Sequence, residues 1–155
     1  MPPTEPDVIE RQIRIRAGRD LVFSYFTDPV KMTAWQGITA ELDPKPGGAY
    51  RINVTGRDIV RGEFTAVEPP ERIAMTWGWE TQGHPIKPGS TQVEITFTEE
   101  GETTRVKIRQ TGVAAPERLN TAYGWQHYLT RLGLVASGRD PGPDPWADPK
   151  AAAQA

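Results

Sequence analysis

Cysteine is absent from the 155-residue sequence, which excludes disulfides, thiolate nucleophiles and zinc sites built on sulfur ligands. A basic surplus is also missing, because 18 Lys and Arg residues stand against 20 Asp and Glu residues, for a formal charge of −2. We therefore expect no nucleic-acid partner. Long apolar runs are lacking as well, and no segment approaches the roughly 20 apolar residues of a membrane-spanning helix, so we expect no membrane insertion.

Metal-ligating and nucleophilic residues are equally sparse. The two histidines, His84 and His127, lie far apart and have no carboxylates at ligand spacing, so we expect no metal and no other cofactor. The serines also lack the context of a nucleophile elbow. Because the sequence contains no recognisable catalytic constellation, it leaves open whether the protein is an enzyme.

The remaining composition is that of one ordinary soluble domain, with 37% hydrophobic and 25% charged residues. Residues 1–7 lack the basic run and apolar stretch of a secretory signal, so we expect a short N-terminal extension and a cytoplasmic location. Residues 8–138 carry regular patterns and should form the domain. Residues 139–155 are rich in proline and alanine, and we expect a tail that is disordered or draped over the surface and adds little stability.

The first third of the domain predicts one strand and two short helices. Alternating isoleucines indicate a half-buried strand over residues 8–17. Asp20 can cap a short helix through residue 27 that buries apolar side chains, and Asp28 followed by Pro29 can start another toward Trp35. The apolar residues expected inside the first helix are Leu21, Val22, Phe23 and Phe26.

The middle of the chain predicts two hairpins and a strand between them. Residues 50–55 and 60–66 alternate around a turn at Gly56, and residues 93–97 and 105–109 form a second pair with a basic outer face. The intervening strand, 73–79, carries Trp77 and Trp79 on its inward face. The loop 80–90 has the length of loops that often close over a site.

A long helix is predicted from Pro116 to near Gly138, because apolar residues recur there at spacings of three and four. The order of one strand, two short helices, more strands and a final helix predicts the α+β class with an antiparallel sheet. We expect a helix-grip fold, in which a curved sheet of six to seven strands wraps around the long C-terminal helix. Such a fold can enclose a cavity.

These segments together resemble the START-like (SRPBCC) superfamily, and within it the proteins named as homologues of the activator of heat-shock-protein-90 ATPase. The resemblance covers roughly residues 8–138, with Gly18 standing where the family commonly has proline. It implies a cavity between the long helix and the sheet, in a superfamily of lipid binders, cyclases and hydrolase-like enzymes. The matching segments are Ile13–Ala17, Val22–Phe23, Thr27–Pro29, Trp35, Asp43–Gly48, Gly62–Phe64, Glu68–Ile73, Met75–Trp77, Tyr123–Trp125, Leu129 and Leu132.

Large side chains on the inward faces suggest where a ligand would lie. Aromatic walls could bind a small hydrophobic molecule, although the same side chains could instead fill a solid core. His127 on the long helix could orient a polar ligand group or could be a surface histidine. The residues predicted to bind the ligand are Trp35, Phe64, Trp77, Trp79, Phe97, Tyr123 and His127.

Three functions are compatible with these observations. Binding of a small hydrophobic ligand in the cavity is the leading hypothesis. A cyclase- or hydrolase-type enzyme in the same cavity would need a polar pair, such as His127 with Asp58 or Glu63. A co-chaperone-like module that stimulates a chaperone ATPase would need an extended partner surface. A homo-oligomer is compatible with the sequence, but no feature indicates one.

Overall fold

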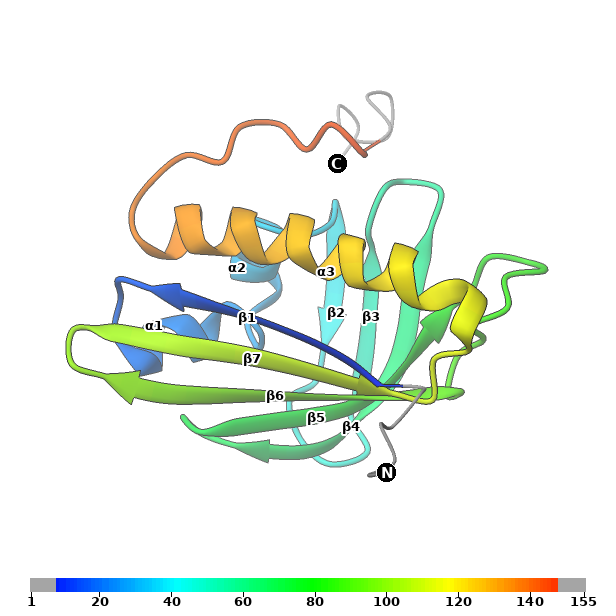
Figure 1. The fold of residues 1–155 in the computed structure, drawn as a ribbon, viewed down its shortest axis with the longest axis horizontal. Coiled ribbons are helices and arrows are strands. Elements are labelled where there is room, and N and C mark those ends of the chain that lie inside the picture. Colours follow the sequence, from blue (N-terminus) through cyan, green and yellow to red (C-terminus); the bar gives the residue numbers. More distant parts are fainter. Residues whose placement is uncertain (1–7, 148–155) are drawn as a thin grey trace, which may run out of the picture.

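The computed structural model describes residues 8–147, which form a curved antiparallel sheet that wraps around one long helix (Figure 1). The seven strands are arranged in the order β1-β7-β6-β5-β4-β3-β2. The long helix α3 lies across one face of this sheet, as the helix-grip prediction requires. No helix in the described range combines the length and the apolar character needed to span a bilayer. The strands are β1 (Ile9–Ile15), β2 (Thr39–Leu42), β3 (Ala49–Asn53), β4 (Ile59–Glu68), β5 (Arg72–Trp79), β6 (Thr91–Glu100) and β7 (Thr103–Thr111); the helices are α1 (Arg19–Ser24), α2 (Pro29–Met32) and α3 (Ala115–Ala136).

The two short helices form at the predicted places, but they end earlier than predicted, at Ser24 and Met32, and one predicted cap is wrong. The Asp28 side chain accepts hydrogen bonds from the backbone N–H groups of Val30 and Lys31 and so caps α2. Asp20 does not cap α1, because the chain enters the helix at Gly18 and Asp20 lies within the first turn. Leu21 points away from the core and is 42% exposed, so its predicted burial was wrong.

Both predicted hairpins form, and the strand β2 was missed. β2 pairs only with β3 at the edge of the sheet. Its four residues alternate, with Ala40 and Leu42 partly buried, but a strand this short gives too few repeats to be recognised from sequence. The basic face of β7 is matched by acidic neighbours. Arg105 approaches Glu100, while Lys107 and Arg109 both approach Glu10.

One end of the space between helix and sheet is filled with aromatic side chains from α1, the α2 region and β6. The Phe23 and Phe97 ring centroids lie 5.1 Å apart, Phe97 and Phe26 lie 5.3 Å apart, and Phe26 and Trp35 lie 5.0 Å apart. The Trp35 Nε1–H donates to the Tyr25 carbonyl oxygen at 3.0 Å, which satisfies the indole inside this cluster. This end of the grip is therefore a solid core.

The chain after α3 turns back and runs along the helix toward its N-terminal half (Figure 1). Residues 139–147 belong to the segment for which a disordered or draped tail was expected. They are draped, and they are anchored: Asp144 accepts hydrogen bonds from Tyr128 and His127, and Trp146 stacks on His127. The composition of the segment does not predict these contacts, because a few specific side chains can hold a proline-rich segment in place. Residues 148–155 of the expected tail lie outside the described residues.

Candidate functional site

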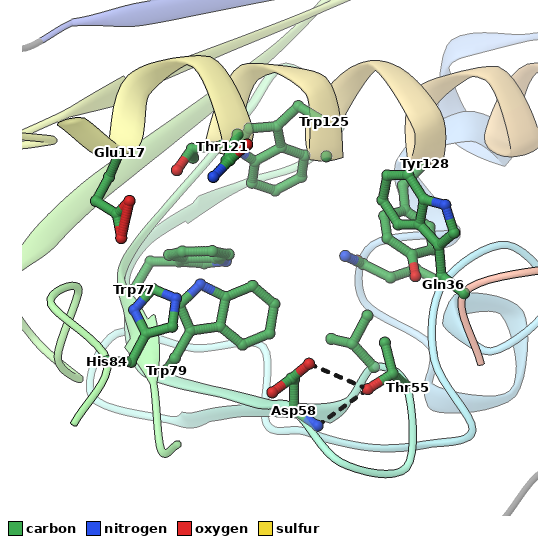
Figure 2. Close-up of a pocket in the computed structure, with 14 residues that line it drawn as sticks. Gln36, Thr55, Asp58, Trp77, Trp79, His84, Glu117, Thr121, Trp125 and Tyr128 are labelled. Carbon is green, nitrogen blue, oxygen red and sulfur yellow. Dashed lines mark hydrogen bonds between the residues drawn. The ribbon is translucent and has the colours of Figure 1, made fainter. Parts of the chain in front are cut away.

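A cavity of about 270 Å³ opens at the end of the grip opposite the aromatic core. It lies between the N-terminal half of α3, strand β5 and the turn that joins β3 to β4 (Figure 2). The segment after α2 and the anchored residues 139–147 contribute Gln36 and Trp146 to its wall. The cavity therefore collects side chains from parts of the chain that are far apart in sequence.

Tryptophans form the apolar part of the wall. Trp77 and Trp79 share one face of β5, with ring centroids 5.1 Å apart and planes at 77°, so the two rings meet as a corner. Trp125 on α3 lies 6.0 Å from Trp77. A buried relay fixes Trp125, because its Nε1–H donates to Gln110 Oε1 at 2.7 Å and the Gln110 amide donates to Thr91 at 3.0 Å. The apolar wall is thus held in place from behind.

Two carboxylates face the same space. Asp58 lies in the β3–β4 turn, where Thr81 donates to its Oδ1 at 3.0 Å and Thr55 to its Oδ2 at 3.4 Å. Glu117 lies in the first turn of α3, a position where the helix dipole favours negative charge. Among the described residues, no Lys or Arg lines the cavity. His84 completes this side of the wall, with its ring 5.8 Å from Trp79.

Gln36 is an unusual member of the wall. Its side chain is 5% exposed, and its Oε1 has no hydrogen-bond partner within residues 8–147. A buried amide oxygen without a partner costs on the order of 1–3 kcal/mol. Figure 2 shows the Gln36 side chain extending into the pocket from the side opposite Trp77 and Trp79. A ligand hydrogen-bond donor would satisfy this group, since rotation of the amide can turn the oxygen toward the cavity.

The face of α3 that meets the sheet changes character along its length. In its C-terminal half this face consists of Leu129, Leu132 and Ala136, which are buried. Before Trp125 the same face is polar or small, and a Cβ atom added at Gly124 would meet nothing within 4 Å. The helix residues that line the cavity, at helical spacing, are Glu117, Asn120, Thr121, Gly124, Trp125 and Tyr128.

The returning chain closes one side of the cavity through a compact polar anchor. Asp144 accepts from the Tyr128 hydroxyl at 2.7 Å and pairs with His127 Nε2 at 2.9 Å. Burial raises the pKa of Tyr128, and its bond to Asp144 raises it further, so Tyr128 stays a neutral donor. Burial alone would raise the pKa of Asp144, but hydrogen bonds from the Trp146 backbone, Tyr128 and His127 outweigh it and lower that pKa.

The seven residues predicted to bind a ligand fall into three groups. Trp77 and Trp79 line the cavity. Tyr123 is 67% exposed on the outside of α3 and stacks on Trp146. His127 lies behind Trp146, 3.7 Å from its ring centroid, and its hydrogen bond to Asp144 joins it to neither Asp58 nor Glu63, so the suggested polar pair is not formed. The remaining three are buried and do not line the cavity: Trp35 and Phe97 belong to the aromatic cluster at the filled end, and Phe64 packs against Tyr50.

Sequence reasoning missed most of the polar wall. One signal was available, because Glu117, Thr121 and Gly124 continue the apolar stripe of α3 with residues that cannot fill a core. Asp58 was named from sequence only as a possible partner of His127, and Gln36 was not named, since each lies outside the helices and strands, where no periodicity indicates which way a side chain points. Trp146 lies beyond a run of prolines and reaches the cavity only through the anchor at Asp144.

Comparisons with known proteins agree with this architecture. The chain is 30% identical to the mouse activator of 90 kDa heat shock protein ATPase homolog 1 over 109 residues, which is 69% of this chain and 30% of the mouse protein. It therefore spans about a third of the length of that relative. An AHSA1-like protein from Rhizobium etli has a solution structure that is 42% identical, with a TM-score of 0.72 over 91% of this chain and 88% of that one.

CalU16 from Micromonospora echinospora has a crystal structure that is 28% identical, with a TM-score of 0.71 over 89% of this chain and 77% of that one. The family described as Activator of Hsp90 ATPase homolog 1-like protein matches residues 16–136, which include α1, the whole of β2 to β7 and α3. The fold, the sheet order and this match over most of the chain agree, and the chain belongs to the family of Activator of Hsp90 ATPase homolog 1-like proteins, with a START-like helix-grip fold.

Proposed function

We propose that this protein binds a small, largely apolar molecule in the cavity beneath the N-terminal half of α3. The observation that carries the proposal is the unfilled space of about 270 Å³ walled by tryptophans from two elements. This volume is just below the range of roughly 300–1,000 Å³ that is typical of ligand pockets, so the ligand should contain one or two rings. The unpartnered Gln36 oxygen supports a ligand that also carries a polar atom.

Gly124 gives a second, independent argument. Glycine in a helix interior costs roughly 1 kcal/mol relative to alanine, and no neighbour within 4 Å would obstruct a Cβ at position 124. Packing against the protein itself therefore does not explain the glycine. A cavity that must stay open for a ligand does explain it.

The test follows the five tryptophan indole N–H signals by NMR during titration with 1-naphthalenemethanol, a neutral aromatic probe. The signals of Trp77, Trp79 and Trp125 should shift saturably. The signal of Trp35 should not move, because its indole is enclosed in the solid core and donates to Tyr25. A probe at 100 times its dissociation constant should also stabilise the fold by about 2.7 kcal/mol.

Gly124→Leu provides the decisive variant, because its side chain should occupy the cavity and leave the helix intact. We expect it to remain folded and to lose at least about tenfold in probe affinity. Leu119→Ala is the matched control, since Leu119 lies on the same helix, is 81% exposed and does not line the cavity. Absence of any saturable indole shift in the wild type, or unchanged binding by Gly124→Leu, would overturn the proposal.

A co-chaperone-like role is the second candidate, and family membership supports it. The mouse relative is named as an activator of the 90 kDa heat shock protein ATPase. On the outer face of α3, Leu119 and Tyr123 lie one turn apart and are 81% and 67% exposed, which offers a partner an apolar contact. Stimulation of a purified heat-shock-protein-90 ATPase that is lost in Leu119→Ala would support this role. No stimulation at a molar excess of the domain would exclude it.

A further inference from the structure

Charge is distributed unevenly around the cavity. Its lining contains the carboxylates of Asp58 and Glu117, and no Lys or Arg lines it within the described part of the chain. The nearby Arg131 is directed elsewhere, because its guanidinium donates to the backbone carbonyls of Trp35, Pro141 and Gly142. An anionic ligand such as a fatty acid would therefore meet like charge without a counterion.

The tryptophans suit the opposite charge. The face of an indole ring carries negative potential, and tryptophan is the strongest aromatic partner for a cation. Trp77 and Trp79 meet at 77° and Trp125 is tilted by 41° to Trp77, so the three rings bound the space from different directions. Such a corner of rings can contact a compact cation on more than one side.

The carboxylates and the rings face the same space from separate elements. Figure 2 shows Asp58 at the lower edge of the space that Trp77, Trp79 and Trp125 border, and Glu117 at the upper left, beside Trp77. Thr55 and Thr81 hold the Asp58 carboxylate in place, and each carboxylate oxygen keeps further acceptor capacity. The buried Gln36 Oε1 on the opposite wall has no hydrogen-bond partner among the described residues, which independently supports a ligand with a polar atom.

We propose that the ligand of this cavity is a cation, an organic ammonium compound whose charged nitrogen lies among Trp77, Trp79 and Trp125 and near Asp58 and Glu117. The proposal rests on the proposed function, since it specifies the chemistry of the same site. Apolar lining binds the body of the ligand, and the rings and carboxylates select its charge.

Three probes of nearly the same shape isolate the effect of charge. Benzyltrimethylammonium is cationic, neopentylbenzene is its neutral isostere and benzylsulfonate is an anion of similar size. In the same indole NMR titration, the cation should bind at least about tenfold more tightly than neopentylbenzene, and benzylsulfonate should bind most weakly. Higher salt should weaken the binding of benzyltrimethylammonium and of neither other probe, because salt screens its attraction to the carboxylates.

Asp58→Asn and Glu117→Gln each remove one charge and keep the size of the side chain. Each should reduce the affinity for benzyltrimethylammonium by about three- to tenfold, and the affinity for neopentylbenzene by a clearly smaller factor, because the neutral probe has no charge to lose a partner. Glu102→Gln removes the same charge at an exposed ion pair with Arg16, on the β6–β7 turn, and should change neither affinity.

Different results would overturn the cation proposal and the proposed function. If neopentylbenzene or benzylsulfonate binds as tightly as the cation, the cation proposal is overturned while the proposed function stands. If the cation binds more tightly but Asp58→Asn and Glu117→Gln behave like Glu102→Gln, the assignment to this site is overturned. If none of these probes and no 1-naphthalenemethanol binds, the proposed function fails as well.

Discussion

The two ends of the space beneath α3 contain similar amounts of aromatic side chain but differ in what closes them. At one end, α1 and the segment after α2 insert Phe23, Phe26 and Trp35 against Phe97, and the rings fill the space. At the other end no helix is inserted. Trp77, Trp79 and Trp125 border a cavity there, and the returning chain with Trp146 covers one side of it.

An aromatic residue on the inward face of this fold can therefore fill the core or line a cavity, depending on which element lies beside it. Trp35 and Trp77 are both nearly fully buried, at 1% and 4% exposure, although only Trp77 lines a cavity. Burial therefore does not separate the two roles. The response to truncation should separate them, because removing a wall residue enlarges an existing space whereas removing a core residue creates a new one.

The largest expected effect comes from Phe26→Ala at the filled end. Phe26 is fully buried and contacts both Trp35 and Phe97, so the substitution should lower the free energy of unfolding by about 3–5 kcal/mol. Trp79→Ala at the hollow end should cost less than about half of that, because Trp79 is only partly buried. Urea denaturation of both variants measures the difference. Equal losses would mean that the two ends are packed alike.

The anchor of the returning chain should give an intermediate effect. Asp144→Asn removes the negative charge of the carboxylate to which Tyr128 and His127 are both hydrogen-bonded. We expect this substitution to lower the free energy of unfolding by about 1–2 kcal/mol. Truncation after Gly138 should cost at least as much. The initial expectation from composition was a negligible cost, so a truncated chain that unfolds at the wild-type urea concentration would favour that expectation over the anchor.

The contribution of Asp144 to the free energy of unfolding should also depend on pH. The pKa of Asp144 is lowered in the folded chain, so its contribution is complete above the unfolded value of about 4 and is lost as pH falls through the folded value. The loss of unfolding free energy caused by Asp144→Asn should therefore shrink as pH falls below about 4. Urea denaturation at each pH measures it, and a loss that grows toward low pH would contradict the sign.

Most of the fold could be predicted from sequence because its signals are local and periodic. The alternation in β6 and β7 and the stripe on α3 each follow from burial of one face. β2 was missed because its four residues give only two partly buried positions, Ala40 and Leu42, which is too short a pattern to recognise. Asp28 was identified as a cap because the cap lies beside the helix it serves, whereas the entry of α1 at Gly18 uses no side-chain hydrogen bond.

The candidate site was harder to predict because its composition depends on which elements meet. Trp77 and Trp79 were found from their strand face, but nothing local distinguishes them from Phe64 on the neighbouring strand. Asp58 and Glu117 are 59 positions apart in sequence and share a wall only through the fold. His127 was chosen for its chemistry, and the chain beyond α3 decides that it contacts Asp144 and Trp146 instead of the cavity.

The smallest expected effect compares two glycines on α3, one at each end of the grip. At Gly133 a new Cβ would lie 2.8 Å from Ile13 Cδ1, so Gly133→Ala must displace the end of that side chain. At Gly124 no neighbour lies within 4 Å, so Gly124→Ala should gain the full helix preference, about 0.5–1 kcal/mol. Thermal unfolding should place Gly124→Ala above the wild type by a few degrees and Gly133→Ala lower than Gly124→Ala. If Gly124→Ala is instead the less stable of the two, the space beside Gly124 is not open, and the distinction between a filled and a hollow end no longer holds.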